Sequence, residues 1–146
     1  MNPFELFQSR RCIRSYTGAP VSDGELQKIL QAANTAPTAM GQYENVHLTV
    51  ITDAKLLAEI EAACAEFMGQ PGSHPLYGAP TLVVASSRFP SEAMANPAYS
   101  DAAILVHTMS LAATEPNTKV IEETTSYEDE TIRIIIDRWC YAFNNT

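Results

Sequence analysis

The apolar positions of this chain follow two different periods in its first 114 residues. Apolar residues recur at helical spacing over residues 26–33, 56–68 and 97–114. The stretches 46–52 and 81–86 are instead rich in β-branched residues, which strands favour. The pattern therefore predicts helices and strands in the order helix, strand, helix, strand, helix.

Residues typical of helix starts precede these stretches. Asn2, which a proline follows, predicts a further short helix at the beginning of the chain. Ser22 and Glu25 have the S-x-x-E spacing of a capping box, in which the two residues satisfy each other's backbone N–H groups. Asp53 is suited to cap the next helix, and we expect Phe67 and Met68 near the end of that helix to be core residues rather than part of a cofactor site.

The stretch 97–114 differs from the other predicted helices because it is apolar on nearly every face. A helix without a polar face is buried, either within a large core or against a second subunit. In a domain of this size the second subunit is the better explanation, so the sequence predicts a homodimer that uses this helix. Its apolar residues include Ala102, Ala103, Ile104, Leu105, Val106, Met109, Leu111 and Ala112.

Composition restricts the class of protein. The 146 residues suffice for one domain with a core, and 46% of them are hydrophobic. The formal net charge of -8 argues against a nucleic-acid partner and against binding to an anionic membrane surface. Three cysteines favour a reducing cytoplasm over a disulfide framework, and the histidines lack the spacing of a metal site. With no membrane-spanning stretch in the sequence, we expect a cytoplasmic protein.

Three arginines, Arg10, Arg11 and Arg14, are concentrated in residues 9–16, here called the arginine segment. The first 114 residues hold ten acidic and six basic side chains, so this segment carries half of that basic charge. No acidic residue lies three or four positions from any of the three, and pairing along a helix therefore cannot neutralise them. A bound anion would neutralise them, and phosphate is suited to this because the planar guanidinium group binds it through paired hydrogen bonds. In an extended chain Arg10, Cys12 and Arg14 would share a ligand-binding face, while the alternative is a solvated basic turn.

A loop of small residues at 35–41 is of a kind that a planar ligand can approach closely. The chain contains neither G-x-x-x-x-G-K nor G-x-G-x-x-G, so neither a P-loop nor a Rossmann turn is available to a nucleotide. The loop and the arginine segment are therefore the candidate binding elements.

Several pieces of the sequence between residues 2 and 114 resemble the FMN-dependent nitroreductase family, and they occur in the family's order. The S-R-R-C-I-R-S-Y run of the arginine segment is similar to the family's S-R-R-S-I-R-x-Y element, with Cys12 where serine is usual. The other similar pieces are residues 20–34 (second helix), 36–38 (A-P-S/T loop), 46–51 (following strand), 77–80 (A-P before the next strand) and 100–113 (central helix).

This resemblance implies an α+β fold of three layers, in which helices flank a mostly antiparallel sheet and which is incomplete at the C-terminal end. Residues 1–114 would form the nitroreductase-like domain, and residues 115–146 a divergent acidic tail. The division follows from the absence of the family's Gly-Leu-Gly turn, later elements and late phosphate-binding basic residue after Thr114.

The resemblance also implies a binding site for FMN. Arg10 and Cys12 would hold the phosphate and the ribityl chain, Arg11 would contribute backbone contacts or charge, and Arg14 would lie at the pyrimidine edge of the flavin. The flavin carries the redox chemistry, so neither a catalytic side chain nor a metal is expected. The residues that would contact the same flavin from the other subunit of the homodimer are Pro37, Thr38, Ala39 and Met40.

The implied function is that of an FMN-dependent oxidoreductase. It would use NADH or NADPH to reduce a small nitroaromatic or quinone-like acceptor by a ping-pong mechanism. The alternative is a non-catalytic remnant of the family that binds flavin or dimerises. A third possibility is a phosphate- or nucleotide-binding regulator that uses only the arginine segment.

Overall fold

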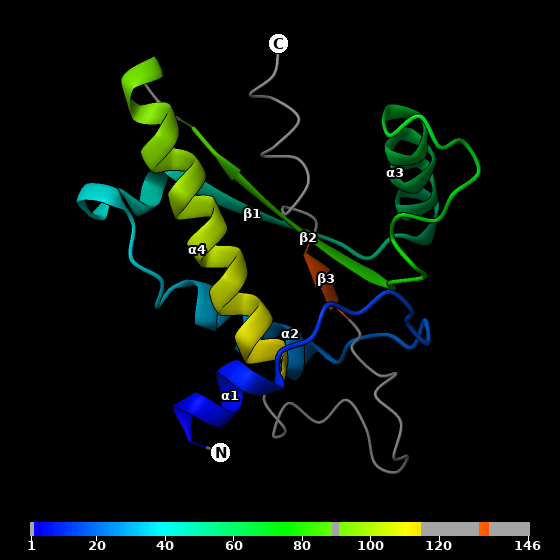
Figure 1. Cartoon of the computed structure of the whole chain (residues 1–146), viewed down its shortest axis with the longest axis horizontal. Coiled ribbons are helices and arrows are strands. Elements are labelled where there is room, and N and C mark those ends of the chain that lie inside the picture. Colours follow the sequence, from blue (N-terminus) through cyan, green and yellow to red (C-terminus); the bar gives the residue numbers. More distant parts are fainter. Residues whose placement is uncertain (1, 89–90, 115–131, 135–146) are drawn as a thin grey trace.

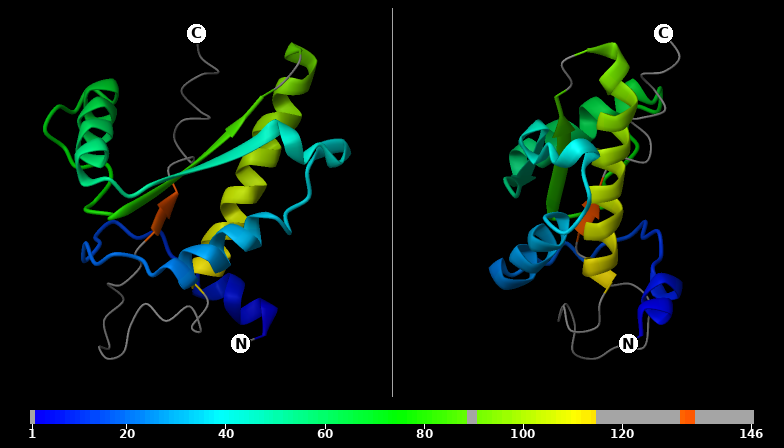
Figure 2. Two further views of the ribbon diagram at one scale, coloured as in Figure 1. Left: turned by 180° about the vertical axis from the view of Figure 1, so that it is seen from behind. Right: turned by 90° about the vertical axis from the view of Figure 1, so that its left-hand side faces the viewer.

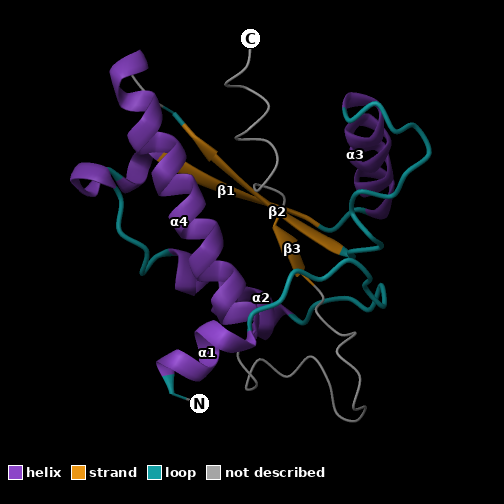
Figure 3. Cartoon of the chain, viewed as in Figure 1, coloured by secondary structure: helices purple, strands orange, loops and turns teal. Residues whose placement is uncertain are grey.

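The computed structural model describes residues 2–88, 91–114 and 132–134 of the chain (Figure 1). Up to α4, its helices and strands follow the predicted order, with short 3₁₀ turns before β1 and α4 (Figure 3). No helix in this described part is both long and apolar enough to cross a membrane. The elements are α1 (Pro3–Ser9), α2 (Asp23–Ala33), η1 (Ala39–Gly41), η2 (Tyr43–Asn45), β1 (Val46–Ile51), α3 (Ala54–Phe67), β2 (Thr81–Ser87), η3 (Glu92–Met94), α4 (Ala95–Thr114) and β3 (Ile132–Ile134).

Side-chain caps confirm the predicted helix starts. Asn2 accepts a hydrogen bond from the backbone N–H of Glu5, whose carboxylate accepts one from the N–H of Asn2, both at 2.9 Å. Ser22 and Glu25 form the same reciprocal capping box at α2. Asp53 accepts a backbone N–H from the first turn of α3 at 2.8 Å. These short-range contacts fix where three helices begin.

β2 is the central strand of a three-stranded sheet with the order β1-β2-β3. β1 pairs with it in antiparallel orientation, from Val46 opposite Ser87 to Ile51 opposite Leu82. The three residues of β3 pair with it in parallel orientation. The predicted acidic tail of residues 115–146 lies mostly outside the described residues, and β3 is the part of that range whose place is described.

Two hydrophobic clusters lie on opposite faces of β2, because successive side chains of a strand point to opposite sides. Val83 belongs to the larger cluster, with α2 and α4, and Leu82 belongs to the smaller cluster, with α3. Figures 1 and 2 show α4 lying across the sheet, while α3 stands apart at one end of the strands. The buried members are Ile29, Ala33, Ala36, Val83, Leu105 and Met109 in the larger cluster, and Leu57, Leu76 and Leu82 in the smaller one.

Within one chain, α4 is buried along one face only. Ala98, Ala102, Leu105 and Met109 are buried at a spacing of three or four residues, since α2 and the sheet cover that side. Ile104 faces elsewhere and is 40% exposed. The predicted second subunit stays a prediction, and this uncovered apolar surface is where we expect it.

The prediction that Phe67 is a core residue is wrong. Its side chain is 61% exposed at the end of α3, whereas Leu57 and Cys64 on the same helix are buried. Met68, for which we made the same prediction, is half-buried. The smaller cluster is too small to cover the whole apolar stripe of α3. The sequence shows which residues are apolar, but packing decides which of them are covered.

Candidate functional site

The arginine segment begins where α1 ends. Arg10 is the C-cap of α1, with extended backbone angles of φ -58° and ψ 132°, and its Nη1 donates a hydrogen bond to the Sγ of Cys12 at 3.5 Å. Cys12 is an exposed free thiol, and Arg14 is exposed as well. The structure therefore brings together Arg10 and Cys12, two of the residues predicted to share a face.

Arg11 points back toward α1. Its Nη1 donates to the carbonyl oxygens of Gln8 and Arg10. Carbonyl groups in the last turn of a helix have no partner within the helix, and a cation is favourable there. Arg11 thus stabilises the end of α1 and fixes the direction in which the arginine segment leaves it.

The far end of the arginine segment is held by a turn that precedes β2. The backbone N–H of Tyr16 donates to the carbonyl oxygen of Tyr77 at 3.1 Å. Tyr77 (φ 54°) and Gly78 (φ 79°) are both left-handed, and the N–H of Ala79 donates to the carbonyl of Leu76, as in a type I′ turn. A Cβ atom on Gly78 would lie 3.5 Å from the carbonyl oxygen of Tyr16, so the two backbones pack closely.

The loop predicted to contact a planar ligand is tied to α4. The backbone N–H of Ala39 donates to Oδ1 of Asp101 at 2.9 Å. Met40 is left-handed (φ 56°) with a 71% exposed side chain, a conformation that costs a non-glycine residue about 1 kcal/mol or more. Thr38 Oγ1 is buried without a hydrogen-bond partner in the described part of the chain, and Pro37 is exposed. The loop is therefore fixed at Ala39 and presents Met40 outward.

The two predicted parts of the site lie apart within one chain. The arginine segment follows α1, which lies beside the C-terminal end of α4 in Figures 1 and 2. The loop is held instead by Asp101, in the N-terminal half of α4. The structure thus brings Arg10 and Cys12 together, but it does not bring either of them to residues 37–40.

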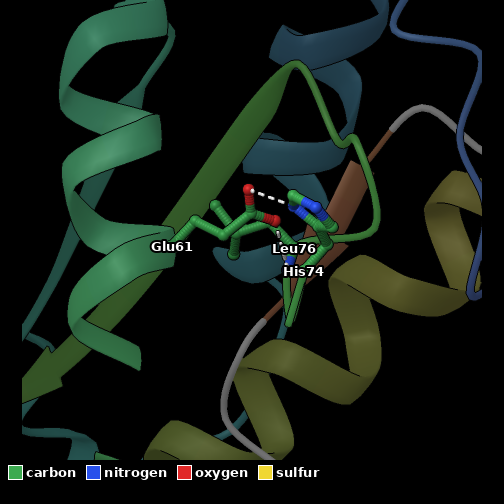
Figure 4. Close-up of polar contacts among 3 residues, drawn as sticks. All are labelled: Glu61, His74 and Leu76. Atoms are coloured by element: carbon green, nitrogen blue, oxygen red, sulfur yellow. Dashed lines mark hydrogen bonds and ion pairs between the residues drawn. The ribbon is translucent and has the colours of Figure 1, made fainter. Parts of the chain in front are cut away.

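Two carboxylates that sequence reasoning missed hold the elements of this site. Asp101 is the one acidic residue within α4, and a charge in so apolar a helix is a signal that could have found it. Glu61, on α3, accepts a hydrogen bond from the backbone N–H of Leu76 and contacts Nδ1 of His74 (Figure 4). No comparable signal marks Glu61, because α3 carries three glutamates.

The donor groups of the arginine segment suit a phosphate. Its eight residues supply three guanidinium groups and a thiol and include no carboxylate. Guanidinium groups form paired, charge-assisted hydrogen bonds with phosphate oxygens. Among the residues that the structure describes, no group of three His, Cys, Asp or Glu side chains is placed to hold a metal ion.

The sequence matches the model of the nitroreductase family over residues 7–118. The fold is similar to that of a nitroreductase with bound FMN from Bacteroides fragilis, with a TM-score of 0.66 and 28% identity, over 78% of this chain and 65% of that one. For a nitroreductase with bound FMN from Desulfitobacterium hafniense, the TM-score is 0.67 and the identity 27%, over 78% of this chain and 65% of that one. For an FMN-dependent nitroreductase from Clostridium difficile, the TM-score is 0.64 and the identity 31%, over 75% of this chain and 54% of that one.

A curated relative matches a shorter stretch. It is a protein of Archaeoglobus fulgidus with the provisional name NADH dehydrogenase/NAD(P)H nitroreductase, and it is 36% identical over 59 residues, which are 40% of this chain and 33% of that protein. The chain spans less than two thirds of the length of each of these relatives.

Proposed function

The chain belongs to the nitroreductase family, and from this premise we propose that it is an FMN-dependent oxidoreductase. Bound FMN would supply the redox chemistry, accepting a hydride from NADH or NADPH and passing two electrons to a nitroaromatic or quinone-like acceptor in a ping-pong sequence. The protein's own contribution is to bind the cofactor, to orient it and to place charge near it.

The observation that carries this proposal is the pairing of Arg10 with Cys12 in an acid-free segment, in a chain whose fold matches FMN-bound relatives. Three guanidinium groups without a carboxylate in the same eight residues make a favourable environment for an anion. The phosphate of FMN is such an anion, and the guanidinium group of Arg10 would bind it through charge-assisted hydrogen bonds.

The residues of the arginine segment have separate roles in this proposal. Arg10 and Cys12 hold the phosphate and the ribityl chain. Arg11 keeps the start of the segment against the end of α1 through its contacts with backbone carbonyls. Arg14 supplies a cation at the pyrimidine edge of the flavin, where negative charge collects on reduction, and so stabilises the reduced cofactor.

A second copy of the chain completes the site in this proposal. Residues 37–40 of one chain lie too far along α4 to adjoin its own arginine segment. A partner chain that packs on the uncovered face of α4, around Ile104, would bring its own residues 37–40 to the flavin. The outward position of Met40, 71% exposed, suits a contact with another chain's cofactor.

Two measurements on the purified chain test the proposal. Titration with FMN, followed by quenching of the flavin fluorescence, should show saturable binding. Oxidation of NADH or NADPH should then require both FMN and an added quinone or nitroaromatic acceptor. FMN binding without oxidation of either nucleotide would favour the non-catalytic alternative, and absence of FMN binding would overturn the proposal.

A further inference from the structure

We propose that Glu61, on α3, is a positioning residue for the arginine segment and acts through the turn at residues 76–79. Glu61 lies on the α3 side of β2 and belongs to none of the segments predicted to bind a ligand. The role of the arginine segment in FMN binding rests on the proposed function, but the positional link itself does not.

The first link joins Glu61 to the loop before β2. Its Oε1 accepts the backbone N–H of Leu76 at 3.2 Å, and its Oε2 lies 3.2 Å from Nδ1 of His74 (Figure 4). The Glu61 side chain is 22% exposed, so its contact with the backbone is only partly screened by water. Leu76 is itself 4% exposed and packs with Leu57 and Leu82. The loop is thus fixed at Leu76 by a side-chain carboxylate and by apolar packing together.

The second link joins this loop to the arginine segment. Leu76 is the first residue of the turn in which Tyr77 and Gly78 are left-handed. A left-handed tyrosine persists only where its surroundings fix it. The carbonyl oxygen of Tyr77 accepts the N–H of Tyr16, two residues after Arg14, at 3.1 Å. The direction of that carbonyl therefore decides where the backbone beyond Arg14 lies.

The two ends of the arginine segment have different supports. The end with Arg10 is held by α1, through the contacts of Arg11 with carbonyl oxygens. The end with Arg14 is held by the turn, and the turn by Glu61. Loss of the Glu61 carboxylate should therefore loosen the Arg14 end and leave the Arg10 end in place.

Amide hydrogen exchange of the full chain without cofactor tests this link directly. In Glu61→Ala, exchange of the Tyr16 amide should be about tenfold faster, because Leu76 loses a hydrogen bond to a charged group. Glu61→Gln should leave it unchanged within about twofold, since the amide oxygen can still accept the N–H of Leu76. The matched control is Glu59→Ala, which removes another α3 carboxylate whose ion-pair partner is Lys55, and it should also change nothing.

Three results would overturn the proposal. The first is an unchanged Tyr16 amide in Glu61→Ala, and the second is a Gln variant that behaves like Ala. The third is equally faster exchange of the β1 and β2 amides, because the variant would then act through global stability rather than through the turn.

FMN affinity, measured where all variants are folded, separates this inference from the proposed function. Glu61→Ala should bind FMN about threefold to tenfold more weakly, and Glu61→Gln should bind it as the unaltered chain does. If the Tyr16 amide responds and FMN affinity does not, Glu61 does position the segment, and the assignment of that segment to FMN is the part that fails.

Discussion

The two faces of β2 support the two parts of the proposed flavin site in different ways. On the face of the larger cluster, buried side chains from α2, β2 and α4 meet, and Asp101 ties the loop with Met40 to that assembly. On the face of the smaller cluster, three buried leucines meet, and Glu61 reaches the arginine segment through a turn. The Arg14 end of the arginine segment therefore rests on the support with fewer buried apolar residues.

This difference has a consequence for dynamics. The stabilisation from apolar burial scales with the area removed from water, so the smaller cluster contributes less free energy than the larger one. Local opening should accordingly start on the side of α3 and the turn, before the α2–α4 side opens. A ligand that bridges the arginine segment to other elements would stabilise the weaker side most.

The largest expected effect is on the larger cluster. Met109→Ala should lower the free energy of unfolding by about 2 to 5 kcal/mol, because Met109 is 0% exposed and its loss leaves a cavity. Urea denaturation measures this. Met40→Ala, the same substitution at a 71% exposed methionine, is the control and should cost about 0.5 kcal/mol or less. Equal losses in both variants would contradict the burial pattern.

The next effect concerns the ligand rather than the fold. Arg10→Ala should weaken FMN binding by about 1.5 to 3 kcal/mol, roughly 10- to 150-fold, as expected for one charge-assisted contact. Arg88→Ala is the matched control, because Arg88 is exposed and follows β2. Equal changes of affinity in Arg10→Ala and Arg88→Ala would show that only the net charge of the chain affects FMN binding.

Arg14→Ala should lower the reduction potential of the flavin more than it weakens FMN binding.

Leu57→Ala tests the smaller cluster. We expect a loss of about 2 kcal/mol in the free energy of unfolding, at the low end for a buried leucine, since few neighbours surround it. Leu56→Ala, one position away and 43% exposed, should cost about 0.5 kcal/mol or less. A loss in Leu57→Ala as large as that of Met109→Ala would remove the distinction between the two faces.

The smallest effect is expected at the tether of the loop. Asp101→Ala should cost about 1 kcal/mol, because the backbone N–H of Ala39 loses the half-buried carboxylate that accepts its hydrogen bond. Exchange of the Ala39 amide should become faster, whereas Asp101→Asn keeps an acceptor and should preserve the protection. An unaffected Ala39 amide in Asp101→Ala would mean that packing alone holds the loop.

The sequence alone determined the parts of this protein that depend on neighbours in the chain. The caps at Asn2, Ser22 and Asp53 act over three residues, so composition and spacing were enough to predict them. β1 and β2 followed from β-branched runs, and the charge of the arginine segment follows directly from its residue types. The family resemblance extended this to the fold, which the comparisons confirm.

The tertiary structure alone decided how these parts meet. The hydrogen-bonded residues Ala39 and Asp101 lie 62 positions apart in the sequence, and Glu61 and Leu76 lie 15 apart. No periodicity in the sequence predicts which distant backbone N–H a carboxylate will bind. The exposure of Phe67 likewise depends on how much of α3 the rest of the protein covers, and the apolar stripe of α3 does not reveal this. Hydrogen bonds between distant residues depend on the packing of whole helices against the sheet, and that packing is settled only when the chain folds.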